Sequence, residues 1–293
     1  MNALCEELAD EIRSKLNSDD IKLPSLPDTV IKVQQLMGKG DYAVADISKI
    51  LANDIAFATV VLRMANSVRF NTSGKEIRNL TMAIQRIGTT SILKLLIGVA
   101  SRLFSDIKQP ALRLCMRQIH DHTLLVSAAA EQVARITQSA NSGDTFMAAL
   151  LHTQGKDVLM ACIPEELLAA NDSERDGICE AFHREMGARL LHKWELPEDF
   201  ILVAQHHGVE SPDRPRLGML DCIDVADVIV HSMEAGGNGE DIDFDTDAAS
   251  RRLRLSPTQI TGIFRRHRQC QIIRRYYRGG GTHGQDYRHN QCR

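Results

Sequence analysis

Apolar residues recur every three or four positions along nearly the whole of this chain, which is the spacing of one face of an α-helix. A typical run contains Val44, Ile47, Ile50 and Leu51. Valine and isoleucine are common, yet they rarely alternate with polar residues at the period of two that marks a half-buried strand. The sequence therefore predicts an all-α protein.

Caps and helix-breaking residues divide this pattern into separate helices. Pro27 and Asp28 suit a first helical turn, Asp54 is a candidate N-cap, and Gly38 and Gly88 each end a run. Beyond Pro110 the pattern predicts helices over residues 111–138, 144–152, 156–170, 175–194, 197–207 and 216–235, and a last helix from Ser256-Pro257 to about Tyr277.

The chain has 293 residues, which is ample for a buried core in each of two packed helical halves. We expect them to divide near residue 110. The predicted segments are an N-terminal helical half (1–110), a second helical half (111–235), an acidic loop with a C-terminal helix (236–278) and a disordered basic tail (279–293).

The composition indicates a globular protein that stays in the cytoplasm. No run approaches about 20 apolar residues, so no membrane span is expected. Residues 1–20 are mixed and acidic, unlike a signal peptide. The seven cysteines are odd in number and form no Cys-x-x-Cys pair, which disfavours a disulfide framework or a thiolate zinc site.

Charge is distributed unevenly along the chain. Residues 262–293 contain eight arginines and one aspartate, a net charge of +7. Because the formal net charge of the whole chain is −3, the remaining residues have a net charge of −10. The basic end could bind nucleic acid or an acidic partner. A terminal helix that frays into a disordered tail is the preferred interpretation, because three glycines follow it at 279–281. The acidic body disfavours non-specific nucleic-acid binding by the whole protein.

Two short helices that meet near Gly88 could in principle form a helix-turn-helix. The second of them contains a single lysine among apolar residues over 92–99. A recognition helix presents polar and basic side chains to DNA, so this helix is expected in a core instead.

The eleven histidines are confined to the chain from His120 onwards. A lone histidine on a helix is more often a satisfied polar group than a metal ligand. Several on separate helices, with a distant carboxylate, are how a helical bundle assembles a metal site. The candidate ligands are His122, His152, His183, His206, His207 and Asp227.

The spacing of His122, His152 and His183 resembles that of the HD superfamily of metal-dependent phosphohydrolases. In that superfamily a histidine, a His-Asp pair and a later aspartate hold the metal, and extra histidines hold a second metal in the HD-GYP branch that cleaves cyclic di-GMP. Here the His-Asp-x-Gly-Lys pattern reads His152-Thr153-Gln154-Gly155-Lys156. The Gly-Tyr-Pro signature of the HD-GYP branch is also absent, because 208–212 read Gly-Val-Glu-Ser-Pro.

Threonine at position 153 weakens the resemblance to an enzyme. Its neutral hydroxyl is a poor ligand for Zn²⁺, Mn²⁺ or Fe. Without a metal, nothing lowers the pKa of a bound water to make the hydrolytic nucleophile. We therefore expect no catalytic residue and no cofactor, with weak binding of a divalent metal left open.

Other segments resemble the HDOD family, bacterial signalling modules related to HD proteins that have usually lost the metal-binding residues. They are Leu23-Pro24-Ser25-Leu26-Pro27, Leu62-Arg63-Met64-Ala65-Asn66-Ser67, Ala83 to Gly88, and Gly187 to His207 with Trp194-Glu195-Leu196-Pro197. The resemblance covers about residues 20–232. It implies an HD-like second half.

The HDOD resemblance also implies a non-enzymatic regulatory role through protein partners. These would be signalling proteins, for instance of a cyclic di-GMP or two-component pathway, and a homo-oligomer is left open. The alternative is a residual phosphohydrolase, acting on a phosphomonoester or cyclic nucleotide. For an intact scaffold we expect Thr153→Asp to raise metal affinity. Asn66 and Ser67 could be functional, although a helix stop is the preferred interpretation.

Overall fold

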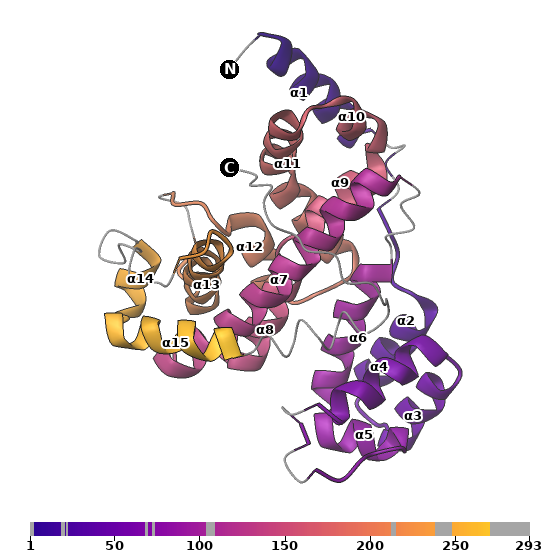
Figure 1. Ribbon diagram of the computed structural model, residues 1–293. Coiled ribbons are helices and arrows are strands. Elements are labelled where there is room, and N and C mark those ends of the chain that lie inside the picture. Colours follow the sequence, from indigo (N-terminus) through magenta and orange to yellow (C-terminus); the bar gives the residue numbers. More distant parts are fainter. Residues whose placement is uncertain are drawn as a thin grey trace. The chain divides into compact units, whose positions relative to one another are not determined.

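A computed structural model describes residues 3–18, 21, 23–67, 70–71, 74–103, 109–211, 215–237 and 248–269 (Figure 1). Most of the described residues are helical and none of them forms a strand, so the all-α prediction is confirmed. The helices are α1 (Ala3–Leu16), α2 (Asp28–Gly38), α3 (Val44–Ala52), α4 (Ile55–Ala65), α5 (Leu80–Ile87), α6 (Thr89–Leu103), α7 (Pro110–Thr137), α8 (Ser142–Leu151), α9 (Gln154–Cys162), α10 (Pro164–Ala169), α11 (Asp172–Lys193), α12 (Glu198–His206), α13 (Gly218–Glu234), α14 (Ala248–Leu253) and α15 (Pro257–Gln269).

The chain forms two compact units. The small unit is Pro24–Asp106, with α2 to α6, and the large unit is Met1–Leu23 together with Ile107–Arg293. The predicted N-terminal half began at residue 1, whereas α1 belongs to the large unit. There Lys15 pairs with Glu166 of α10 at 2.5 Å, and Arg189 of α11 donates a hydrogen bond to the Leu16 carbonyl oxygen at 2.9 Å.

In the small unit, the side chain of Asn66 joins the end of α4 to the segment before α5. Its amide nitrogen donates to the carbonyl oxygens of Leu62 and Ile77, at 2.9 and 2.7 Å. Its amide oxygen accepts from the Ile77 N–H at 2.7 Å. All of these partners are backbone atoms, which favours the interpretation of Asn66 as a helix stop.

The pair α5–α6 is bent by 102°. Gly88 makes the corner with φ +91°, in the left-handed region that glycine adopts without strain. Ile92 and Leu96 of α6 are fully buried, so this helix faces a core as expected. No single described helix is long and apolar enough to cross a membrane. Among the described helices one pair, α5 with Thr89–Ala100, is long and apolar enough when its two helices are taken together, and this pair is bent.

The large unit includes two helices that lie beyond the segment resembling HDOD proteins. From α14 and α15, Ala249, Ile260, Ile263 and Phe264 join a buried cluster with residues of α7 and α13, among them Val225. Ion pairs that reach the buried carboxylate of Asp221 add to this packing. From α14, Arg252 lies 2.8 Å from Asp221 of α13 and 2.7 Å from Glu210. These helices are therefore an integral part of the unit.

The helix predicted over 156–170 is two helices in the structure. Pro164 begins α10, and Ile163 before it has φ −130° and ψ 49°, outside the helical region. A residue that precedes proline is sterically disfavoured in the helical conformation, which explains the break. The last helix begins at Pro257 as predicted and is described to Gln269; its predicted end, most of the acidic loop and the basic tail lie outside the described residues.

Candidate functional site

The predicted site residues come from five helices of the large unit or from their ends. His122 lies on α7, His152 is the C-cap of α8, His183 lies on α11 and Asp227 lies on α13. His206 is the last residue of α12, and His207 is its C-cap. The structure brings five of the six into two neighbouring groups of side chains.

The motif glycine explains how α9 and α11 come close enough to build the site. A Cβ on Gly155 would lie 1.7 Å from the carbonyl oxygen of His183 and 2.7 Å from the backbone nitrogen of Gly187. Only a residue without a side chain fits between these backbones. The next motif residue, Lys156, pairs with Glu180 of α11 at 2.9 Å. Two residues of the motif therefore have structural roles.

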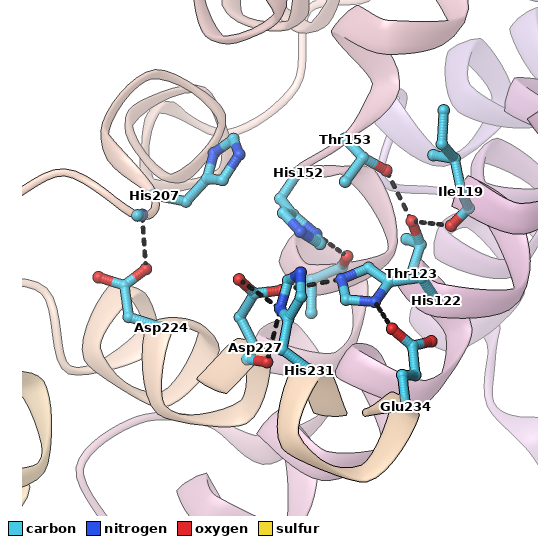
Figure 2. Close-up of polar contacts among 12 residues, drawn as sticks. Ile119, His122, Thr123, His152, Thr153, His207, Asp224, Asp227, His231 and Glu234 are labelled. Carbon is cyan, nitrogen blue, oxygen red and sulfur yellow. Dashed lines mark hydrogen bonds and ion pairs between the residues drawn. The ribbon is translucent and has the colours of Figure 1, made fainter. Parts of the chain in front are cut away.

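The first group, which we call the carboxylate–histidine group, is His122, Asp227, His231 and Glu234 (Figure 2). The Nε2 atom of His122 lies 2.9 Å from Oδ1 of Asp227, and its Nδ1 lies 3.0 Å from Oε2 of Glu234. Nδ1 of His231 lies 3.4 Å from Oδ2 of Asp227. Because positions four and seven residues after Asp227 share its face of α13, all three side chains meet α7.

Opposite charges in this group shift the pKa values of its members. Burial lowers the pKa of His122, but the hydrogen bonds that the ring donates to Asp227 and Glu234 outweigh burial and raise the pKa to about 9. Burial raises the pKa of Asp227, yet its bonds to His122 and His231 hold that pKa well below the usual range. At neutral pH and without a metal, His122 is therefore a cation between two carboxylates.

The second group, the buried histidine group, is His152, His183 and His207. In each ring Nδ1 lies near a carbonyl oxygen three or four residues earlier, at 2.5 Å for His152, 2.7 Å for His183 and 3.0 Å for His207. The Nε2 atoms of His183 and His207 are 3.0 Å apart, and the rings of His152 and His207 have centroids 4.8 Å apart. These contacts hold the three rings together.

Burial keeps the histidines of this second group neutral. Loss of hydration lowers the pKa values of His152 and His207 to about 3, and it also lowers that of His183. A neutral ring has a single N–H. If both His183 and His207 donated from Nδ1 to carbonyl oxygens, two lone pairs would face each other across 3.0 Å. Moving one proton to Nε2 would instead leave an Nδ1 lone pair against a carbonyl oxygen, so two neutral rings cannot satisfy all three contacts at once.

His206 is the predicted residue that the structure leaves outside both groups. It is half-buried, and its side chain makes no hydrogen bond, ion pair or ring contact with the described members of either group. Its neighbour His207 points the other way because successive residues at a helix end face different directions. The paired histidines in the sequence therefore supply one ring to the site.

Thr153 lies where the HD pattern has its aspartate, and its hydroxyl already has a partner. Its Oγ1 lies 2.7 Å from Oγ1 of Thr123, and both side chains are buried (Figure 2). Thr123 donates its own proton to the carbonyl oxygen of Ile119 at 2.7 Å. Thr153 must then be the donor of the pair, so the position presents a neutral hydroxyl and no carboxylate to a metal.

Sequence reasoning missed His231, Glu234 and Thr123. The first two could have been found from their spacing, because they follow Asp227 by four and seven residues and so share one face of a predicted helix. Thr123 follows His122 directly and has no chemical feature in the sequence that marks it. His120 was also unassigned; its Nε2 lies 2.9 Å from Oδ2 of Asp157 and links α7 to α9.

The raised pKa of His122 predicts how stability depends on pH. The folded value of about 9 is above the unfolded value of about 6.5, so the stabilisation is complete below pH 6.5 and is lost as pH rises through 9. In metal-free protein, the free energy of unfolding should fall across this window by up to about 1.4 kcal/mol per pH unit. Urea denaturation at a series of pH values measures this slope.

Glu234→Gln is the matched control for the pH dependence. It removes one of the two carboxylates that hold the proton on His122, while the amide keeps the size of the side chain. The slope between pH 6.5 and 9 should become shallower. An identical slope in the wild type and the variant would show that this contact does not hold the proton.

Comparison with known proteins identifies the family. Residues 23–209 match the model of the HDOD domain. An uncharacterised protein from Treponema pallidum (strain Nichols) is 24% identical over 244 residues. That match covers 79% of this chain and 45% of the relative, so the chain spans less than half of the relative's length.

Two solved structures share the fold. A candidate metal-dependent phosphohydrolase from Shewanella amazonensis SB2B has a TM-score of 0.70 at 18% identity, over 90% of this chain and 100% of that one. An HDOD domain protein of unknown function from Geobacter sulfurreducens has a TM-score of 0.64 at 20% identity, over 92% and 95%. The predicted HDOD-type helical architecture is confirmed, and the chain belongs to the HDOD family.

Proposed function

We propose that this protein is a non-enzymatic bacterial signalling module that acts by binding other proteins, and that its inherited HD metal site is degenerate. Membership of the HDOD family fits a regulatory role. The partners that we propose are cytoplasmic signalling proteins, for example of a cyclic di-GMP or two-component pathway.

One observation supports the absence of catalysis most strongly. The position of the HD aspartate is occupied by Thr153, whose hydroxyl is buried and donates to Thr123. A catalytic metal needs ligands that offset its charge, and a neutral hydroxyl that already has a hydrogen-bond partner does not provide this. The inherited ligand set is therefore incomplete at its centre.

The test is a direct assay of hydrolysis. Purified full-length protein is incubated with Mn²⁺ or Fe²⁺ and either a phosphomonoester or cyclic di-GMP. We expect turnover no faster than in buffer that contains the metal alone. Metal-dependent turnover that is abolished in Asp227→Asn would contradict the proposal, because a contaminating enzyme would not respond to that substitution.

A residual phosphohydrolase is the second candidate. It is favoured by the ligand atoms of His122, Asp227 and His231, which all lie within 4.8 Å of one another. A bound metal would supply an activated water for hydrolysis. His122 and Asp227 would hold the metal, and the same assay with Mn²⁺ or Fe²⁺ separates the two candidates.

A further inference from the structure

The carboxylate–histidine group contains two residues that the HD pattern does not include. His231 and Glu234 both extend from α13 toward His122 (Figure 2). His231 is the more exposed, with 65% of its side-chain surface accessible, whereas 17% of that of His122 is accessible. The group is therefore reachable from solvent on the side where His231 lies.

The distances within the group suit a tetrahedral metal ion. Zn²⁺ binds histidine nitrogen and carboxylate oxygen at about 2.0–2.2 Å, which places neighbouring ligand atoms of a tetrahedron about 3.3 Å apart. Here His122 Nε2 and Asp227 Oδ1 are 2.9 Å apart, and His231 Nδ1 and Asp227 Oδ2 are 3.4 Å apart. These two distances run to different oxygens of Asp227, and Nδ1 of His231 also lies 3.0 Å from the Asp227 carbonyl oxygen. One ligand atom from each residue lies within 4.8 Å of the others, so rotation of the His231 and Asp227 side chains would bring three ligands around one ion.

Glu234 has the geometry of a residue that orients a ligand. It lies 3.0 Å from Nδ1 of His122, on the opposite side of the ring from Asp227. A carboxylate that accepts the Nδ1 proton leaves the Nε2 lone pair free for a metal and fixes the direction of the ring. Carboxylate–histidine–metal arrangements of this kind occur around protein zinc sites.

We propose that His122, Asp227 and His231 bind one divalent transition metal ion of the Zn²⁺ class, with Glu234 as the residue that positions His122. Two imidazole nitrogens and a carboxylate oxygen suit such an ion, whereas Mg²⁺ and Ca²⁺ favour sites made of oxygen atoms alone. This site goes beyond the proposed function, because a bound metal is compatible with a protein that catalyses nothing.

The proposed site differs from the inherited HD site in which histidine it uses. The HD arrangement would join His122 and Asp227 to His152 and to a carboxylate at position 153. Here His152 packs against His207 in the buried histidine group, and position 153 has a hydroxyl that donates to Thr123. In the proposed site His231 takes the place of His152 and of the carboxylate at position 153. An experiment can detect this difference in ligands.

The experiment measures metal affinity without any assay of turnover. Metal-free full-length protein is titrated with Zn²⁺ by calorimetry and with Co²⁺ by visible absorption, which reports a tetrahedral environment. The variants are His231→Ala, Glu234→Gln, His152→Gln and the control His192→Ala, which removes an exposed histidine of the same unit. Thermal unfolding confirms that each variant is folded before titration.

We expect His231→Ala to weaken binding at least about 10-fold and Glu234→Gln to weaken it about 10-fold, as for other residues that orient a metal ligand. His192→Ala and His152→Gln should stay within about 3-fold of the wild type. The proposal is overturned if His231→Ala binds as the wild type does, or if His152→Gln loses as much affinity as His231→Ala. Neither result depends on whether the protein hydrolyses anything.

Discussion

Gly155→Ala is expected to lower the free energy of unfolding by about 3 kcal/mol or more. The added Cβ would lie 1.7 Å from the carbonyl oxygen of His183 and 2.6 Å from its carbonyl carbon. Both are backbone atoms, so no side chain can rotate to make room. Helices α9 and α11 would have to separate, which would also disturb the buried histidine group. Urea denaturation of the variant and the wild type measures the loss.

Gly177→Ala is the matched control for this prediction. Gly177 is an exposed residue of α11, and a Cβ there meets nothing within 4 Å. Alanine has the higher helix propensity, so this variant should be as stable as the wild type or more stable by about 0.4–1 kcal/mol. An equal loss of unfolding free energy in the two variants would contradict the prediction. It would show that helix propensity, and not the close approach of α9 and α11, determines the effect of alanine at position 155.

Thr153→Asp should destabilise the metal-free protein by about 3 kcal/mol, the scale of a buried charge without a partner. Thr153 donates to Thr123, which in turn donates to the Ile119 carbonyl oxygen. An aspartate at this position can only accept, so a carboxylate would face a hydroxyl whose proton is already used. Urea denaturation after removal of metal ions tests this, and Thr153→Val is the control, with an expected loss of about 1 kcal/mol for one hydrogen bond.

The same variant also tests whether the inherited metal site can be restored. With Zn²⁺ or Mn²⁺ present, the ion would offset the new carboxylate, so Thr153→Asp should regain stability and bind the metal more tightly than the wild type. Unchanged metal affinity would mean that His152 and Asp227 no longer have the geometry of that site. Full stability of Thr153→Asp without metal would show that the carboxylate accepts a hydrogen bond from Thr123, and would contradict the assignment of Thr153 as the donor of the pair.

The contacts of Thr153 change how its substitution is understood. In the sequence, threonine in place of aspartate at position 153 is a single change in a recognisable motif. In the structure the Thr153 hydroxyl donates a hydrogen bond to Thr123, which donates in turn to a backbone carbonyl oxygen of α7. Gly155 and Lys156 have structural partners on α11. The motif has therefore kept its role in helix packing, while its metal chemistry depends on residues elsewhere.

Much of the fold could be predicted because helix formation depends on short-range patterns in the sequence. The period of apolar residues predicts α7 and α13 to within two residues at each end. Pro257 marks the first turn of α15. The apolar spacing continues across Pro164, so the pattern predicts one helix where the structure has a break at Ile163. The proline itself indicates this break.

The site could be predicted only in part, because it depends on which helix faces meet. The sequence by itself determined that His122, His152, His183 and Asp227 lie on separate helices, and that position 153 lacks a carboxylate. It could not rank His206 against His207, since a turn of the chain at the end of α12 decides which ring points inward.

Only the tertiary structure decided that the candidates form two groups and that His231 and Glu234 join the first. His122 and Glu234 are 112 positions apart in the chain, and their 3.0 Å contact exists because α13 packs along α7. Packing of that kind follows from the shape and burial of whole helix faces, which no spacing between two residues reports. The helices were therefore determined by local periodicity, and the chemistry of the site by the way they pack.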